Sequence, residues 1–294
     1  MIRFDDRVAI VTGAGAGLGR SHALGLAARG AQVVVNDLGD AQSVVAEIEA
    51  AGGAAMAHSA DVSDADQVAD MIAQAMDRWG RIDILINNAG ILRDKTFAKM
   101  TLDDFRKIVD VHLMGSANCC HAVWPVMRAQ GYGRIVLTSS GSGLYGNFGQ
   151  SNYGAAKAAM VGLMNVLHLE GARDNIRVNT LAPTAATQMT ENLLPEAALA
   201  LLQPETITPG VLYLVSEDGP SRTILSAGAG TFAQTRIFET QGYMLEGDIT
   251  PEAVAKNWHA ITDATGQEEL QDAFAQTRKY ALRAAKAKGG TLDW

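Results

Sequence analysis

Short apolar runs alternate along the chain with longer segments in which apolar residues recur at helical spacing. The runs predict β-strands, and the segments between them predict α-helices. The predicted strands are Val8–Val11, Val33–Val35, Ala54–Ser59, Ile82–Ile86, Arg134–Thr138, Ile176–Leu181 and Ile224–Leu225. Regular strand–helix alternation is typical of a parallel sheet covered by helices on both faces. We therefore expect one doubly wound α/β domain with seven parallel strands over residues 1–230.

Two predicted helices of this domain carry residues that define or disturb their ends. Ser63 stands before a helical pattern that runs to Trp79, and serine is a favoured N-cap residue. A longer helical region covers Leu102–Met127 and contains Pro125. Because proline has no backbone N–H to donate, we expect this helix to end or bend there.

Residues 231–294 do not continue the alternation and are mostly helical in pattern. Thr250-Pro251-Glu252 has the residue order of a helix start, with threonine as N-cap, proline next and an acid in the first turn. Residues 272–288 are basic and rich in alanine, and we expect them to form a solvated helix. The sequence thus predicts a helical C-terminal extension, 231–294, packed on the same domain.

Composition and charge exclude several classes of protein. The chain has 294 residues, 48% of them hydrophobic and 19% charged, which excludes a disordered or fibrous protein. A net charge of −8 without a long basic run argues against nucleic-acid binding. No apolar stretch reaches the ~18–20 residues that span a membrane, so we expect no membrane contact. The six histidines show no ligand spacing, so no metal is expected.

The number of cysteines and the composition of the N-terminal residues bear on the expected cellular location. Cys119 and Cys120 are the two cysteines, too few for a disulfide scaffold. The N-terminal residues lack the apolar core of a secretory signal. We therefore expect a cytoplasmic protein.

A glycine-rich turn, Thr12–Gly19, follows the first predicted strand and opens the first predicted helix. A strand that turns sharply into a helix whose free N–H groups face a pyrophosphate needs glycine, because side chains there would block the ligand. We expect the dinucleotide contacts of this turn to come from Gly13, Gly17, Leu18 and Gly19. The sequence therefore predicts a dinucleotide-binding domain of the Rossmann type.

Asp37 lies 18 residues after Gly19, at the end of the second predicted strand. A carboxylate at this place accepts hydrogen bonds from the adenosine ribose hydroxyls and repels a 2′-phosphate. No arginine or lysine stands beside it, so the sequence favours NAD over NADP. The alternative is that Asp37 caps the segment that follows it.

The candidate catalytic residues are Ser140, Tyr153 and Lys157, separated by twelve and three residues. Tyr153 and Lys157 share one face of a helix. A free tyrosine has a pKa near 10, and a neighbouring ammonium group together with a cationic nicotinamide ring lowers it. Tyr153 can then exchange a proton with the oxygen of an alcohol or ketone. Ser140 follows a strand end and can hydrogen-bond the same oxygen, so both residues are expected to bind substrate.

These motifs resemble the short-chain dehydrogenase/reductase family over about residues 4–230. The resemblance implies an oxidoreductase that interconverts a secondary alcohol and a ketone, acting on a small molecule as a homodimer or homotetramer. The further cofactor contacts that it implies are those of Asp61, Val62, Asn88, Ala89, Gly90, Pro183 and Thr187, together with Tyr153 and Lys157.

Two positions depart from the family pattern. His112 stands where the family usually has an asparagine that holds a water in a proton relay. The histidine can fill that catalytic role through its ring or its backbone carbonyl, or it can simply pack in its helix. Thr184 stands where the family commonly has glycine, beside the expected nicotinamide site.

Within the family, the segments Val35–Gly39, Asn88–Asp94, Tyr145–Gln150 and Thr250–Trp258 resemble the dehydrogenase part of peroxisomal multifunctional enzymes of type 2. This likeness implies that the substrate is an acyl-CoA thioester, with (3R)-hydroxyacyl-CoA oxidised to 3-ketoacyl-CoA by NAD. A steroid or other alicyclic alcohol, or a 3-ketoacyl thioester that is reduced, stays open. The apolar segment Thr187–Gln203 suits each of these substrates. A dinucleotide-binding protein without catalysis is the least favoured alternative.

Overall fold

The computed structural model describes residues 1–186 and 195–293. The chain divides into two compact units, Met1–Thr235 and Arg236–Trp294. The strands of the first unit are β1 (Val8–Thr12), β2 (Gln32–Asn36), β3 (Ala54–His58), β4 (Ile84–Asn87), β5 (Gly133–Thr138), β6 (Ile176–Pro183), β7 (Ile224–Gly228) and β8 (Thr231–Thr235). Its helices are α1 (Gly17–Ala27), α2 (Ala41–Ala50), α3 (Ala65–Trp79), α4 (Leu102–Val109), α5 (Gly115–Gln130), α6 (Gly141–Tyr145), α7 (Ser151–Gly171), α8 (Glu196–Leu201) and α9 (Thr208–Leu214).

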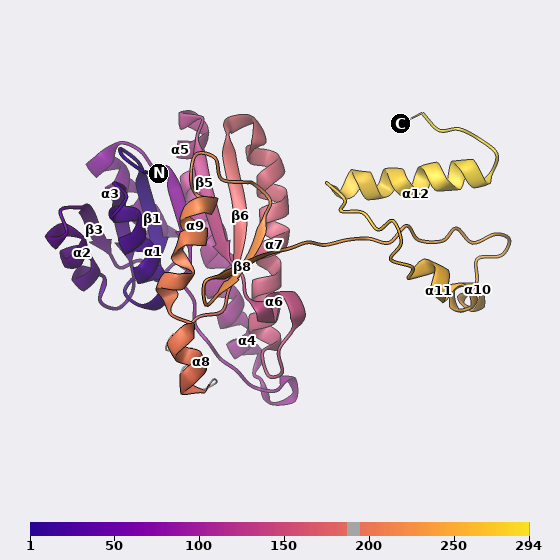
Figure 1. Ribbon diagram of the computed structural model, residues 1–294, viewed down its shortest axis with the longest axis horizontal. Helices are drawn as coiled ribbons and strands as arrows, with labels where there is room; N and C mark the ends of the chain where they lie inside the picture. The colour runs from indigo at the N-terminus through magenta and orange to yellow at the C-terminus, as the bar shows by residue number, and fades with distance from the viewer. Residues whose placement is uncertain (187–194, 294) are drawn as a thin grey trace. The chain divides into compact units, whose positions relative to one another are not determined.

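One sheet runs through the first unit in the order β3-β2-β1-β4-β5-β6-β7-β8 (Figure 1). The seven predicted strands are present and parallel, which confirms the doubly wound α/β fold of the Rossmann type. The strand order reverses between β1 and β4. In open α/β sheets, ligands bind at the carboxyl ends of the strands beside such a reversal.

The number of strands differs from the prediction, because β8 adds an eighth strand antiparallel to β7. The two are joined by a hairpin turn at Ala229 and Gly230, with φ of 48° and 73°. Two consecutive positive φ values are typical of the tight turn that joins antiparallel strands. The expected helical pattern after residue 230 is therefore wrong for Thr231–Thr235.

Helices cover both faces of the sheet because side chains alternate along each strand. Ala9 and Val11 of β1 face a cluster that includes Leu26 of α1, with residues of α2 and α9. Ile10 faces the opposite cluster, which includes Val123 of α5 and residues of α3 and α7. Both faces of the sheet are thus buried, as the near-continuous apolar strands predict.

The predicted helix Leu102–Met127 is realised as α4 and α5 joined by a π-helical turn, Asp110–Met114. Helix α5 continues through Pro125 to Gln130, so the helix does not end at the proline. The irregular turn lies where the sequence places His112. Single π-helical turns inside helices are frequent at functional sites.

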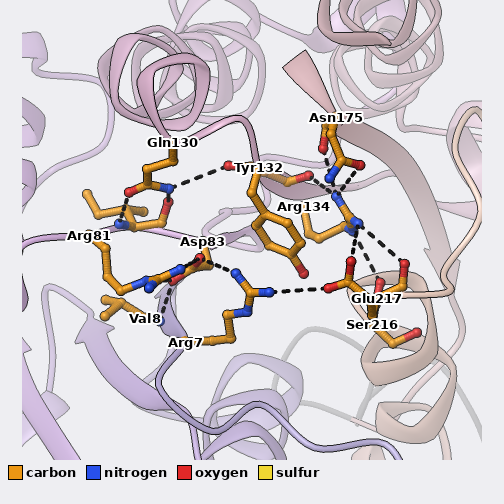
Figure 2. Close-up of polar contacts among 12 residues, drawn as sticks. Arg7, Val8, Arg81, Asp83, Gln130, Tyr132, Arg134, Asn175, Ser216 and Glu217 are labelled. Atoms are coloured by element: carbon orange, nitrogen blue, oxygen red, sulfur yellow. Dashed lines mark hydrogen bonds and ion pairs between the residues drawn. The ribbon is translucent and has the colours of Figure 1, made fainter. Parts of the chain in front are cut away.

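The amino-terminal edge of the sheet holds a network of buried charges (Figure 2). Asp83 precedes β4, and its side chain is 0% exposed. Its carboxylate accepts hydrogen bonds from Arg7 at 2.9 Å, from Arg81 at 2.7 and 2.8 Å, and from the backbone N–H of Val8 at 2.9 Å. The carboxylate therefore ties the beginning of β1 to the beginning of β4.

Arg134 of β5 extends this network toward β6 and α9. Its buried guanidinium donates to the backbone carbonyls of Asn175 at 2.8 Å, Ser216 at 3.2 Å and Glu217 at 3.3 Å. The ring of Tyr132 lies between Arg134 and Arg7, with guanidinium carbons 4.2 and 3.8 Å from its centroid. Four central strands are thus cross-linked at the edge opposite their carboxyl ends.

The second unit contains α10 (Pro251–Lys256), α11 (Trp258–Ile261) and α12 (Ala273–Ala287). Thr250 caps α10 as predicted, because its hydroxyl accepts the backbone N–H of Ala253 at 3.1 Å. The basic helix α12 is not simply solvated. Lys279 donates to Glu239 at 3.0 Å and to the carbonyl of Thr240 at 2.6 Å, so it fixes a preceding segment of this unit.

Two kinds of feature are absent from the described residues. No helix among them is both long and apolar enough to cross a membrane. Within the same ranges, no group of three or more histidine, cysteine or acidic side chains has the placement to hold a metal ion.

Candidate active site

The glycine-rich turn connects β1 to α1 at the carboxyl edge of the sheet. Gly13 and Gly17 adopt φ of 62° and 54°, values that side chains disfavour. A Cβ at Gly13 would lie 2.7 Å from Cα of Ala89, and one at Gly19 would collide with the carbonyl of Gly13. The N-cap residue of α1 makes no side-chain cap, and its first turn has no acid. The turn and the uncapped helix end fit a pyrophosphate.

Asn88 locks this turn to the end of β4. Its side-chain amide donates to the carbonyls of Thr12 at 3.1 Å and Gly13 at 2.9 Å. The hydroxyl of Thr12 accepts the backbone N–H groups of Asn88 at 3.0 Å and Ala89 at 3.1 Å. Gly90 follows, and a Cβ there would collide with the ring of His112. The predicted residues Asn88, Ala89 and Gly90 therefore lie beside the glycine-rich turn.

Asp37 stands at the end of β2, facing the same turn. Its carboxylate accepts the backbone N–H groups of Gly15 at 2.8 Å and Gly39 at 2.7 Å. Asp37 does not cap α2, since that role belongs to Asp40, which accepts the N–H of Ser43 at 3.0 Å. The helix-cap alternative for Asp37 is therefore wrong.

An open cleft of about 760 Å³ borders Asp37. Its lining includes the carboxylates of Asp40, Asp66 and Asp70, and one histidine, His58. Acidic side chains thus outnumber basic ones in the lining of this cleft.

The remaining predicted cofactor contacts lie at the ends of neighbouring strands. Asp61 follows β3, and hydrogen bonding by Ser63 holds the pKa of its carboxyl below the ordinary value. The carbonyl of Val62 accepts the side-chain amide of Asn118 at 3.0 Å. Pro183 is the last residue of β6. Thr187 lies outside the described residues.

Tyr153 and Lys157 lie on α7, and the ammonium nitrogen of Lys157 is 5.6 Å from the centroid of the Tyr153 ring. Lys157 is buried and donates to the carbonyl of Thr138 at 2.7 Å. Ser140 caps the short helix α6, and its hydroxyl accepts the N–H of Ser142 at 3.2 Å. The three predicted catalytic residues thus meet beyond the carboxyl end of β5.

Burial is the main influence on the pKa values of Tyr153 and Lys157. It raises the pKa of Tyr153. The hydrogen bond from Ser140 lowers this pKa, and the negative charge of Asp94 raises it further. Burial lowers the pKa of Lys157 to about 7. Burial therefore outweighs the hydrogen bond from Ser140 that lowers the pKa of Tyr153.

His112 occupies the π-helical turn and presents its ring edge-on to Tyr153, with 5.2 Å between ring centroids. Its Nε2 lies 2.8 Å from the carbonyl oxygen and 3.1 Å from the backbone nitrogen of Ile91. Among the described residues, nothing bonds its buried Nδ1. Burial lowers the pKa of His112 to about 3, so the ring is neutral. The carbonyl of His112 accepts the hydroxyl of Ser116 at 2.7 Å.

Several residues of the site are not among the sequence-predicted ones. Thr12 holds Asn88, as described above. Asn152 is buried, donates to the carbonyl of Arg93 at 3.1 Å and accepts the N–H of Tyr153 at 2.7 Å. Gln150 donates to Asp94 at 2.6 Å. The signal in the sequence was the position of these two residues: Asn152 directly precedes Tyr153, and Gln150 lies three residues before it.

The model of the short chain dehydrogenase family matches residues 7–198. A peroxisomal hydratase-dehydrogenase-epimerase of Saccharomyces cerevisiae is 48% identical over 89% of this chain and 31% of its own length. A short-chain type dehydrogenase/reductase of Mycobacterium tuberculosis is 45% identical over 89% of this chain and 96% of its own length.

Solved structures give the same assignment. Full-length peroxisomal multifunctional enzyme type 2 from Drosophila melanogaster has a TM-score of 0.84 at 40% identity, covering 97% of this chain and 50% of its own. A 7α-hydroxysteroid dehydrogenase complexed with NADH and 7-oxo glycochenodeoxycholic acid has a TM-score of 0.72 at 33% identity, covering 78% of this chain and 95% of its own. The chain thus spans half or less of the two multifunctional relatives. It belongs to the short-chain dehydrogenase family and is an oxidoreductase.

Proposed function

We propose that the protein is an NAD-dependent dehydrogenase that oxidises (3R)-hydroxyacyl-CoA to 3-ketoacyl-CoA. The observation that carries the reaction type is the meeting of Ser140, Tyr153 and Lys157 at the sheet edge that also holds the glycine-rich turn. This placement puts a proton acceptor for an alcohol next to a dinucleotide site.

In the proposed mechanism, Tyr153 as phenolate takes the proton of the substrate hydroxyl, and Ser140 donates a hydrogen bond to the same oxygen. Lys157, when protonated, stabilises the phenolate. The glycine-rich turn and Asp37 would hold NAD, which would supply the hydride acceptor and a positive charge beside the phenol. His112 holds the segment after β4 through Ile91 and supports the face of the Tyr153 ring. In the reverse direction, neutral Tyr153 donates its proton to the ketone.

The choice of NAD over NADP rests on Asp37 and its surroundings. The two backbone N–H groups that bond its carboxylate fix its orientation at the end of β2. Asp40, Asp66 and Asp70 add negative charge around the adjoining cleft. A 2′-phosphate would meet repulsion there, whereas two ribose hydroxyls can donate to the carboxylate.

Replacing Asp37 by alanine is expected to raise the KM for NAD about 10- to 100-fold, because hydrogen bonds to a charged group are lost. The KM for NADP should change little or fall, so the preference between the cofactors narrows. Steady-state kinetics with both cofactors measure this. Asp77→Asn, an exposed charge change on α3 outside the cleft, serves as the control. An unchanged NAD/NADP ratio in Asp37→Ala would contradict the assignment.

The proposed substrate class rests on how far the likeness extends. Relatives named 3-oxoacyl-[acyl-carrier-protein] reductase, such as that of Synechocystis, cover 74% of this chain. Multifunctional relatives, such as peroxisomal multifunctional enzyme type 2 of Mus musculus, cover 92%. The longer match includes residues of the second unit, which supports an acyl-CoA substrate over an acyl-carrier-protein thioester.

A kinetic panel tests the substrate. The expected result is that kcat/KM for (3R)-hydroxyacyl-CoA exceeds that for its (3S) isomer, for steroid alcohols and for acyl-carrier-protein thioesters. A higher kcat/KM for a steroid alcohol would favour the alternative that the 7α-hydroxysteroid dehydrogenase neighbour represents. No reduction of NAD by any member of the panel would favour a binding protein without catalysis.

A homodimer or homotetramer in the cytoplasm completes the proposal. On α7, Val166 and Leu169 are 53% and 49% exposed, an apolar surface that a second copy would cover. Cys119 and Cys120 are both free thiols, as expected in a reducing compartment.

A further inference from the structure

Two loops at the active-site edge are tied together by hydrogen bonds, although they lie more than fifty residues apart in sequence. Residues 91–96 follow β4, and residues 146–150 precede α7. The backbone N–H of Lys95 donates to the carbonyl of Gly149 at 2.9 Å. The side-chain amide of Gln150 donates to the carboxylate of Asp94 at 2.6 Å. The end of one loop therefore fixes the start of the helix that carries Tyr153.

Gln150 is 7% exposed, and both ends of its amide are used. Its oxygen accepts the hydroxyl of Ser142 at 2.7 Å and the side-chain amide of Asn147 at 3.1 Å. Its nitrogen donates to Asp94, so the amide has one satisfied orientation. Ser142 in turn donates its backbone N–H to the hydroxyl of Ser140 at 3.2 Å. A chain of contacts thus runs from Asp94 through Gln150 and Ser142 to Ser140.

The charges around Tyr153 come from few groups. Lys157 lies on its own helix, and the ring of His112 faces it from the π-helical turn. Asp94 acts on it from the loop after β4 and raises the pKa of Tyr153.

The other charged side chains near this loop interact with one another. On α4, Asp104 pairs with Lys95 at 3.5 Å, and Arg93 acts on that same Asp104 carboxyl. Helix α6, which also packs against α7, carries no charged residue. Asp94 is therefore the anionic side chain that acts on the phenol among the described residues.

We propose that Gln150 and Asp94 form a positioning pair: Gln150 fixes Ser140 and the start of α7, and holds the Asp94 carboxylate at a set place beside Tyr153. This inference rests on the proposed role of Tyr153 as the acid/base. Burial is the larger cause that favours the protonated phenol, and the negative charge of Asp94 adds to it. The pair thereby raises the pH at which alcohol oxidation begins.

The test compares the full-length protein with Asp94→Asn and Gln150→Leu. Asparagine can still accept the hydrogen bond of Gln150, so Asp94→Asn removes the charge and keeps the contact. The rise of kcat/KM with pH for a (3R)-hydroxyacyl-CoA is expected to move to lower pH, because loss of the carboxylate charge lowers the pKa of Tyr153. Asp103→Asn, a charge change on α4 at a 93% exposed side chain, should leave the profile unchanged.

Gln150→Leu removes the side-chain contacts of Gln150 with Asp94 and Ser142 and leaves the backbone bond between Lys95 and Gly149. It is expected to lower kcat up to about 100-fold, as misplacement of catalytic groups does. Its effect on KM should be smaller. A kcat within twofold of the parent would overturn the positioning role. Asp94 is exposed, so Asp94→Asn carries the test even if Gln150→Leu does not fold.

A second measurement separates this inference from the proposed function. Tyrosinate absorbance is followed against pH, and the curve of Tyr153→Phe is subtracted to isolate the ionisation of Tyr153. A lower midpoint in Asp94→Asn supports the pair even if Tyr153→Phe keeps turnover, in which case the proposed function fails alone. If Tyr153→Phe is inactive but both the absorbance midpoint and the kinetic profile of Asp94→Asn match the parent, the pair is refuted and the proposed function stands.

Discussion

Replacing Tyr153 by phenylalanine is expected to lower kcat for alcohol oxidation by about 10²- to 10⁴-fold, the usual contribution of a general acid/base. The neighbouring groups are held by other contacts: Lys157 donates to the carbonyl of Thr138, and His112 is buried, neutral and bonded to Ile91. The change removes one oxygen and keeps the ring, so the edge-on contact with His112 survives. The affinity for NAD, measured by calorimetry, should therefore be nearly unchanged.

The control for this variant is Tyr213→Phe, which removes the same atom from a half-exposed tyrosine of α9. Its kinetics should match those of the parent. If Tyr153→Phe retained more than a tenth of the parent kcat, another group would have to accept the proton. The assignment of Tyr153 would then be withdrawn.

Replacing Asp83 by leucine is expected to lower the free energy of unfolding by about 3 kcal/mol, the low end for breaking a buried charge cluster. The carboxylate is 0% exposed, and its loss leaves the N–H of Val8 and the guanidinium of Arg81 without this acceptor, while Arg7 keeps its contact with Glu217. The low end applies because the side chains of Arg7 and Arg81 keep 27% and 39% of their surface exposed. Urea denaturation with an unchanged slope measures the effect.

Glu217→Gln is the matched control, since Glu217 pairs with Arg7 at 3.2 Å but is 65% exposed. Exposed pairs contribute about 0–1 kcal/mol, so this variant should unfold near the parent midpoint. If both variants lost the same free energy of unfolding, burial of Asp83 would not be the reason for its contribution to stability. Asp83 lies at the sheet edge away from the catalytic residues, so Asp83→Leu should keep its kcat at temperatures where it is folded.

The sequence allowed the fold to be predicted where its pattern has a direct physical cause. Seven strands are short apolar runs because both faces of the sheet are buried. The eighth strand, β8, is exposed along most of its length, so its residues carry no such pattern. Its turn places Ala229 at a positive φ, where asparagine or glycine would have been the usual signal.

The N-cap of α3 shows that a local detail can depend on which of two neighbouring side chains accepts the free backbone N–H groups. Ser63 was the expected cap of α3, but the carboxylate of Asp64 caps it and accepts the N–H groups of Asp66 and Gln67. The hydroxyl of Ser63 instead donates to Asp61 at 2.6 Å. A serine beside an aspartate thus leaves the cap position ambiguous within one residue.

The residues of the candidate site were predicted because the proposed chemistry demands particular side chains, and their roles stay predictions. Their mutual interactions could not be predicted. The contact between Asp94 and Gln150 depends on two loops that meet only in the folded chain. The pKa of Tyr153 depends on burial, which spacing along a helix does not reveal. The basic residues Lys279 and Arg283 of α12 suggested a solvated surface, yet they hold residues 239–242 of their own unit.

The network around Asp83 and Arg134 has a consequence for how the sequence of such an enzyme can evolve. It fixes the starts of β1, β4, β5 and β6 by contacts that involve none of the loops at the opposite edge. Insertions and substitutions in those loops can therefore accumulate without loosening the strands that carry them. Proteins that share this network can therefore change substrate through their loops while the starts of the central strands stay fixed.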